Sequence, residues 1–129
     1  MKYISADEIL AIHEEMINIF GGSHGIRDFN LLYSAIYRPQ ASFAGEDLYK
    51  NIFDKAAALV HSSLLNHPFS DGNKRTAYTS CARFLYINGF NLVASTSQII
   101  TFTKSVENKK LDITTIVVWL KKHSKKLKI

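Results

Sequence analysis

An imidazole, a carboxylate, an amide and two cations lie within nine residues of this chain, in the segment HPFSDGNKR from His67 to Arg75. A neutral imidazole can accept a proton from an alcohol near physiological pH. Lysine and arginine bind phosphate groups, and a carboxylate such as Asp71 can hold a Mg²⁺ ion beside a polyphosphate. The segment therefore contains the groups needed for phosphoryl or nucleotidyl transfer to a hydroxyl.

This segment lies between two stretches in which apolar residues recur at helical spacing. We expect one helix from Leu48 to Leu65 and another from about Asp71 to Asn88, so that HPFS is a tight loop and DGNKR a first helical turn. The free N–H groups of a first turn, the helix dipole and the small Gly72 make an anion site. Lys74 and Arg75 add positive charge, and the predicted occupant is a phosphate.

Each of these residues, taken alone, has a simpler structural interpretation. His67 could be a loop histidine bonded to backbone, Asp71 a helix N-cap, and Lys74 with Arg75 an exposed helix face. Phe69 is expected to anchor the loop in the core under either interpretation. The joint occurrence of the polar groups at one helix start favours a site.

The rest of the apolar pattern predicts an all-α fold, a compact bundle of about six helices with a flap or short hairpin before the central helix. The β-branched run near the end of the chain favours strand, but its cap and basic end favour helix. The other predicted helices run from the capping box of Ser5 and Glu8 to Phe20, from Asp28 to Arg38, from Gln98 to Val106 and from Asp112 to about Lys126, and the flap occupies residues 38–47.

Length and composition favour one cytoplasmic domain, residues 1–129. The chain is 47% hydrophobic, which suffices for one core. The single cysteine, Cys81, cannot form an internal disulfide and suits a reducing compartment. The N-terminus lacks the apolar centre of a signal peptide, and no apolar run approaches the roughly 18 residues of a membrane span.

The net charge of +5 is compatible with nucleic acid, an acidic protein or a phosphorylated small molecule. Part of the excess lies in the last nine residues, KKHSKKLKI. We interpret this run as the exposed side and C-terminal end of the last helix, where cations are favoured by the dipole. A nucleic-acid patch is less favoured because aromatic residues do not interleave with the lysines.

The segment HPFSDGNKR resembles the signature of the Fic/Doc superfamily, H-P-F-x-D/E/N-G/A-N-G/K-R, and its lysine is similar to that of the Doc branch, the death-on-curing toxins. The likeness extends to GGSHGIRD, to SAIYRPQASFAGEDLY and to the glycine of FLYING, and so covers most of the chain. It implies a Fic fold and a bacterial or phage toxin that uses ATP and Mg²⁺ to modify a protein hydroxyl. It further implies phosphorylation of elongation factor Tu and inhibition by a small antitoxin, through which alone nucleic acid would be contacted.

The resemblance also implies roles for individual positions. The flap would align the target chain by strand-like pairing. His67 would be the catalytic base and Asp71 the Mg²⁺ ligand or its orienter, while Gly72, Asn73, Lys74 and Arg75 would form the anion cradle, with Lys74 and Arg75 also acting in catalysis.

The resemblance leaves the transferred group open. Doc-type motifs can have alanine where this chain has Gly72, and glycine there is usual in the AMP-transferring branch. Lys74 favours γ-phosphate transfer to a serine or threonine, because its side chain fills the space where that branch places the α- and β-phosphates. AMP transfer is the alternative, and a non-catalytic basic domain that binds nucleic acid is a second one.

Three further residues have weaker signals. Glu107 lies in TKSVEN, which fits the S/T-x-x-x-E-G/N pattern by which some Fic proteins block their own site, but so loose a pattern is expected by chance. We place Glu107 in the connection before the last helix and interpret the match as accidental. His61 could support the site from the preceding helix, and Cys81 is interpreted as core packing.

Overall fold

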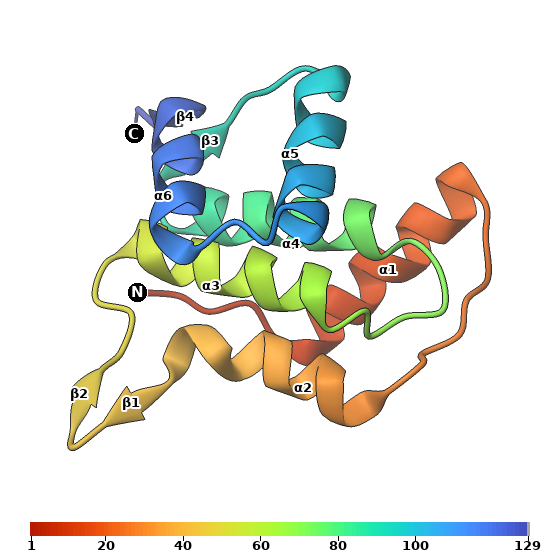
Figure 1. Ribbon diagram of the computed structural model, residues 1–129, viewed down its shortest axis with the longest axis horizontal. Helices are drawn as coiled ribbons and strands as arrows, with labels where there is room; N and C mark the ends of the chain where they lie inside the picture. Colours follow the sequence, from red (N-terminus) through yellow and green to blue (C-terminus); the bar gives the residue numbers. More distant parts are fainter. Residues whose placement is uncertain (129) are drawn as a thin grey trace.

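The computed structural model describes residues 1–128, so Ile129, the last residue of the predicted domain, lies outside the described residues. It confirms the all-α fold class (Figure 1). The described part contains the helices α1 (Ala6–Phe20), α2 (Phe29–Tyr37), α3 (Ile52–Leu65), α4 (Asn73–Ile87), α5 (Thr96–Asn108) and α6 (Ile113–Lys122), a 3₁₀ turn at Arg38–Gln40, and the short strands β1 (Ser42–Phe43), β2 (Glu46–Asp47), β3 (Phe90–Leu92) and β4 (Ser124–Lys126).

The central helix is α3, which contacts α2, α4, α5 and α6. Its residues from Ala56 to Val60 are completely buried, as is Leu64. A helix that is apolar on several faces must be covered on all of them. The three consecutive alanines, residues 56–58, leave room for neighbouring helices to approach closely. The central placement of this helix is as predicted, but α3 begins at Ile52, after the cap Asn51, and not at Leu48.

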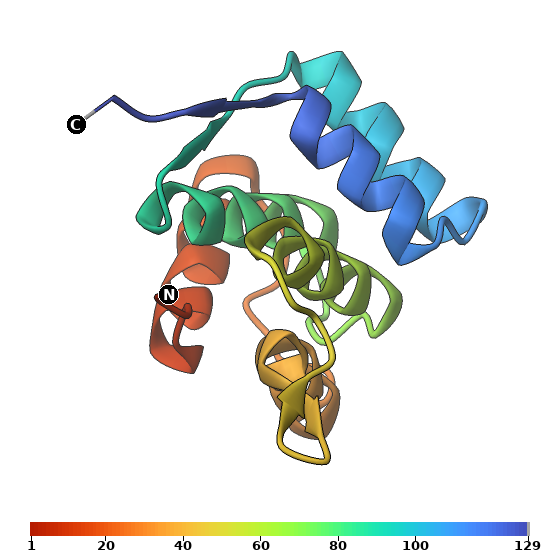
Figure 2. The ribbon, with the colours of Figure 1, turned by 90° about the vertical axis from the view of Figure 1, so that its left-hand side faces the viewer.

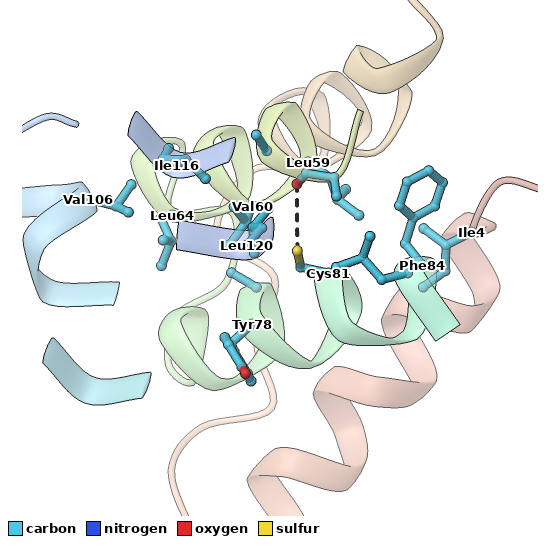
Figure 3. Packing of buried hydrophobic residues seen from close by; sticks show 14 of the residues in the cluster. Ile4, Leu59, Val60, Leu64, Tyr78, Cys81, Phe84, Val106, Ile116 and Leu120 are labelled. Atoms are coloured by element: carbon cyan, nitrogen blue, oxygen red, sulfur yellow. Dashed lines mark hydrogen bonds between the residues drawn. The ribbon is translucent and has the colours of Figure 1, made fainter. Parts of the chain in front are cut away.

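The core continues from α3 into α4, α5, α6 and the N-terminal segment that holds Ile4 (Figure 3). Cys81 of α4 is fully buried, and its thiol donates to the carbonyl oxygen of Ala56 at 3.6 Å, the dashed line of Figure 3. Burial raises the pKa of Cys81 to about 12 and is also the main cause that raises the pKa of Tyr78 to about 12. The thiol therefore packs as a small apolar group, as the sequence predicted.

Helices α5 and α6 lie side by side and cover one face of the α3–α4 layer (Figure 2). Two expectations for this region were wrong. Helix α5 begins at Thr96, because Ser95 and Gln98 form a capping box, and it continues to Asn108, so Glu107 lies within the helix. Helix α6 ends at Lys122, because residues Ser124–Lys126 pair as β4 with β3 instead.

The predicted flap is a hairpin in which β1 and β2 pair antiparallel. Its turn, Ala44 and Gly45, has positive φ at both residues (54° and 81°), as a tight hairpin turn requires. Lys55, buried in α3, donates to Asp47 at the base of the hairpin at 3.1 Å. The hairpin projects beyond the N-terminal end of α3, whereas the polar motif follows its C-terminal end (Figure 1).

None of the helices in residues 1–128 is both long enough and apolar enough to cross a lipid bilayer.

Candidate active site

The loop between α3 and α4 is clamped by the segment that follows α1, residues 23–28. Ile26 pairs with Phe69 in an isolated antiparallel bridge, and the N–H of Ser70 donates to the carbonyl of Gly25 at 2.9 Å. The Phe69 side chain is buried, which confirms its predicted role as an anchor. Backbone pairing on one side and a buried ring on the other hold the polar residues of the loop in place.

His67 occupies the position directly after the C-cap of α3 and has left-handed backbone geometry, with φ 45°. Glycine is the usual residue at this position of a helix end. Arg27 donates from Nε to the carbonyl of His67 at 2.6 Å and from Nη2 to the carbonyl of Asn66 at 2.7 Å. The guanidinium therefore fixes the backbone of His67, while the side chain is 48% exposed and free to contact a ligand.

Asp71 does not start α4, contrary to the expectation that DGNKR is the first helical turn. The helix begins at Asn73 after Gly72, whose φ of 74° is left-handed and interrupts the helical path. The Asp71 carboxylate accepts the N–H of Ser23 through Oδ2 at 2.8 Å, and its carbonyl accepts Nε2–H of His13 at 2.9 Å. The first bond holds the carboxylate of Asp71, and the second holds its backbone.

His13 of α1 lies beneath the motif. Its ring is buried and stacks on Phe69, with 3.7 Å between centroids and 7° between planes. A Cβ added to Gly72 would lie 3.0 Å from Cδ1 of Ile17 and 3.7 Å from the His13 ring. The close approach of α1 and the positive φ together explain why position 72 is a glycine.

Asn73 holds the loop and the helix together through both atoms of its amide. Its Oδ1 accepts the N–H of Phe69 at 3.0 Å, and its Nδ2 donates to the carbonyl of the same residue at 2.9 Å. Both side-chain groups are therefore used within the protein. Asn73 therefore orders the cradle.

The N-terminus of α4 opens into a hollow of about 490 Å³. Gly72 has no side chain to cap this helix, so the N–H groups of the first turn are free of a side-chain cap. The other five helices of the described chain are capped by Ser5, Asp28, Asn51, Ser95 and Asp112. The hollow is lined by His67, by Ser70 to Arg75, and by Ile99, Ile100, Thr103 and Lys104 of α5.

The structure thus brings the predicted site residues to one hollow, in which positive charge dominates. Lys74 and Arg75 of α4 face it together with Lys104 of α5. The guanidinium of Arg75 lies 4.1 Å from the centre of the Phe20 ring, which holds it at the edge. Free N–H groups, a helix dipole and three cations make this hollow suited to a polyphosphate.

Asp71 is the one carboxylate among the lining residues. Within residues 1–128, no three His, Cys, Asp or Glu side chains are grouped so that they could hold a metal ion by themselves. Mg²⁺ fits such a site, because it commonly binds through one or two carboxylates, water and the phosphates of its substrate. A metal that needs a full protein cage does not fit.

Sequence reasoning missed several residues that hold this site. His13 and Ser23 orient Asp71, and Arg27 fixes His67, although all three lie at least forty residues away in sequence. The likeness of GGSHGIRD to the family was a signal for Ser23 and Arg27, whereas His13 lies outside that segment. Oε2 of Glu107 lies 3.2 Å from Nζ of Lys74.

His61 does not line the hollow. Its Nδ1 accepts from Arg38 Nη1 at 2.7 Å, and Arg38 also donates to Tyr49 and Ser62. Burial, and secondarily the charge of Arg38, lower the pKa of His61. This histidine therefore serves the junction of α3 with the hairpin, and the sequence-based suggestion that it supports the site is not supported by its contacts.

Comparison with known proteins gives a consistent assignment. The pattern of the Fic/DOC family matches residues 3–85, which include the whole motif. Toxin Doc of Mycolicibacterium smegmatis is 51% identical over 75 residues, 58% of this chain and 58% of that protein. Protein kinase doc of Escherichia phage P1 is 35% identical over 95 residues, 74% of this chain and 75% of that protein. The match thus spans little more than half the length of the mycobacterial relative.

The family match covers more than half of the chain, and both relatives carry the name Doc. The clamped HPFSDGNKR loop, the uncapped start of α4 and the all-α fold agree with it. The chain therefore belongs to the Fic/DOC family, within its Doc branch.

Proposed function

We propose that this chain is the toxin of a toxin–antitoxin pair and transfers the γ-phosphate of ATP to a serine or threonine hydroxyl of a translation factor, elongation factor Tu. The names of the relatives, a toxin and a protein kinase, support the general class. The finer assignment is supported by one observation, the lysine ammonium of Lys74 at the uncapped start of α4.

Lys74 bears on which phosphorus is attacked. The AMP-transferring members that this motif resembles have glycine at that position, which leaves room for the α- and β-phosphates over the helix N-terminus. Here the side chain lines the hollow and is 44% exposed. A four-carbon ammonium chain occupies that room, so ATP binds in another orientation and presents its γ-phosphate to the hydroxyl.

The proposed step needs one base and one charge cradle. The target hydroxyl oxygen attacks the γ-phosphorus, and its proton passes to the imidazole of His67. The bond between the γ-phosphorus and the β,γ-bridging oxygen breaks, and its electron pair leaves with ADP. Lys74, Arg75 and the first-turn N–H groups of α4 stabilise the negative charge of the phosphates.

Asp71 would hold Mg²⁺ in this reaction, and the metal would neutralise charge on the phosphates. The Ser23 N–H occupies Oδ2 of the carboxylate, and among the described residues no hydrogen bond is made to Oδ1. Ser23 and His13 orient this carboxylate without closing it off. The protein itself supplies one metal ligand, and the remaining positions would belong to water and phosphate.

The AMP-transfer alternative loses its main support in the structure. It rested on the glycine at position 72, which is usual in the AMP-transferring branch. Gly72 is accounted for by its left-handed backbone and by the closeness of Ile17, without reference to a nucleotide. The nucleic-acid alternative is weakened as well. Lys125 and Lys126 lie on β4, which pairs with β3 after the C-terminal end of α4, whereas the motif lies at the N-terminal end of the same helix. These lysines therefore do not extend the basic surface of the motif.

ATP labelled separately at the α and γ positions tests the transferred group. Incubation with Mg²⁺ and elongation factor Tu should carry label into the target from the γ position alone. The Lys74→Gly variant should lose γ transfer, whereas Lys109→Gly, which removes an exposed lysine outside the hollow, should retain it. Label from the α position, or full γ transfer by Lys74→Gly, would contradict the assigned role of the lysine.

Expression in cells tests the toxin assignment. The wild-type chain should arrest growth, and a co-expressed small protein encoded beside it should relieve the arrest. The His67→Ala variant should be soluble and harmless. Unimpaired growth with abundant soluble wild-type protein would contradict this part of the proposal.

A further inference from the structure

Glu107 is a largely buried carboxylate that lies near two polar residues of the motif, Lys74 and His67. Its Oε2 is 3.2 Å from Nζ of Lys74 and 3.8 Å from Nε2 of His67. It comes from α5, which packs against α3 and α4, the two helices that the motif connects. Its side chain is 12% exposed, against 44% for Lys74 and 48% for His67.

Local stability does not explain a glutamate at this place. Its second oxygen, Oε1, is buried and makes no hydrogen bond to any atom in the described part of the chain. A buried carboxylate oxygen without a donor is unfavourable, and an apolar side chain at this position would avoid that cost. The position of the charge beside Lys74 and His67 therefore indicates a role in the chemistry of the motif.

We propose that Glu107 is a positioning residue for phosphoryl transfer, which holds the Lys74 ammonium in place and stabilises His67 once His67 has taken the proton of the target hydroxyl. This inference rests on the proposed function in that His67 acts as the base. On this proposal the site includes a charged residue of α5 in addition to the residues of the motif.

The two contacts act at different stages. The Lys74 contact exists before the reaction and directs one of the three N–H donors of the ammonium, leaving two for phosphate. The His67 contact, at 3.8 Å, is too long for a strong hydrogen bond and becomes an ion pair only when the imidazole is charged. It therefore strengthens toward the transition state, and such interactions raise kcat rather than substrate affinity.

Glu107 does not occupy the place proposed for the phosphates. The residues that line the hollow include Thr103 and Lys104 from the same helix, but Glu107 is not among them. The Glu107 side chain is 12% exposed and the Lys74 side chain is 44% exposed, so the lysine is the more accessible partner of the pair. The geometry thus favours support of the site over blockage of it.

The Glu107→Gln variant keeps the shape and removes the charge, and Glu15→Gln, on the exposed face of α1, is the matched control. With ATP, Mg²⁺ and the target protein, Glu107→Gln should lower kcat by about tenfold to a hundredfold, as loss of an orienting partner typically does. The KM for ATP should not rise, because Lys74 keeps its charge for the phosphates. Glu15→Gln should match the wild type in both constants.

An unchanged or increased kcat for Glu107→Gln would overturn the proposal, and an increase would show that the carboxylate blocks the site. A rise in the KM for ATP with unchanged kcat would also overturn it. A purely structural role predicts a lower melting temperature for Glu107→Gln with unchanged kcat, whereas the positioning role predicts a lower kcat with a melting temperature close to that of the wild type, because the amide keeps the shape and the lost ion pair is exposed on its lysine side.

A nuclear magnetic resonance measurement separates this proposal from the proposed function. The ammonium protons of Lys74, protected by the ion pair, should give an observable resonance in the wild type and in Glu15→Gln but not in Glu107→Gln. If the wild type transfers AMP, or nothing at all, the proposed function fails while this readout still tests the contact. A Lys74 resonance that is unaffected by Glu107→Gln would overturn the positioning role whatever group is transferred.

Discussion

The left-handed backbone of His67 makes its replacement by glycine and by alanine differ in a predictable way. With φ 45°, any residue that has a Cβ is strained there, by about 1–2 kcal/mol relative to glycine. Glycine also lowers the stability by roughly 0.4–1 kcal/mol, because it makes the unfolded chain more flexible, and this offsets part of the relieved strain. Both variants lose the same contact with Glu107, so that term cancels between them.

We therefore expect His67→Gly to be more stable than His67→Ala by on the order of 1 kcal/mol, or about 3 °C in melting temperature for a chain of this size. Both variants should lose activity by about a hundredfold to ten-thousandfold, because both lack the base. The measurements are thermal denaturation followed by circular dichroism and γ-phosphate transfer to the target.

The pair of variants separates the roles of backbone and side chain. If His67→Ala were as stable as His67→Gly, the strain attributed to this loop would be wrong. If either variant transferred phosphate at the wild-type rate, His67 would not be the base. Equal loss of activity with a difference in stability is the one combination that fits both parts of the reasoning.

Three further predictions concern the cradle and the core. Gly72→Ala should destabilise the fold by about 1–2 kcal/mol through its φ of 74°, and by more than Gly45→Ala, because its methyl would also lie 3.0 Å from Ile17 whereas nothing lies within 4 Å at Gly45; equal melting temperatures would contradict this. Asn73→Ala should cost about 1–3 kcal/mol in denaturant unfolding, since a loop N–H and a carbonyl lose their partner. Burial raises the pKa of Cys81 from its ordinary 9.0 to about 12, so the stability linked to this thiol is complete below pH 9 and is lost as pH rises toward 12; Cys81→Ala should flatten that fall.

The helices were predictable because each depends on local signals. Side-chain caps such as Ser5, Asp28 and Asp112 and apolar residues at helical spacing fixed the number and order of the helices. The ends were less predictable. Residues Ser124–Lys126, which were predicted to end the last helix, form a strand instead. They pair with β3, and no local sequence pattern encodes such a contact between distant segments.

The candidate site divides in the same way. The motif placed its own polar residues around one helix start, which local sequence can indicate. It could not show that His13, Ser23 and Arg27 orient the motif, since these contacts come from the packing of α1 and the clamp against the loop. Glu107 was misplaced because the end of α5 was set too early; the helix continues to Asn108 and brings the Glu107 carboxylate to Lys74, while the interpretation of the TKSVEN match as accidental stays a prediction.

The central claim is most directly tested by the adduct formed on elongation factor Tu after incubation with this chain, ATP and Mg²⁺. Mass spectrometry of the target, together with chromatography of the nucleotides, identifies the transferred group and its co-product. The account predicts a phosphate on a serine or threonine, ADP in equal amount, and neither product with His67→Ala. An adenylate adduct with release of pyrophosphate, or a phosphate adduct formed equally well without His67, would contradict it.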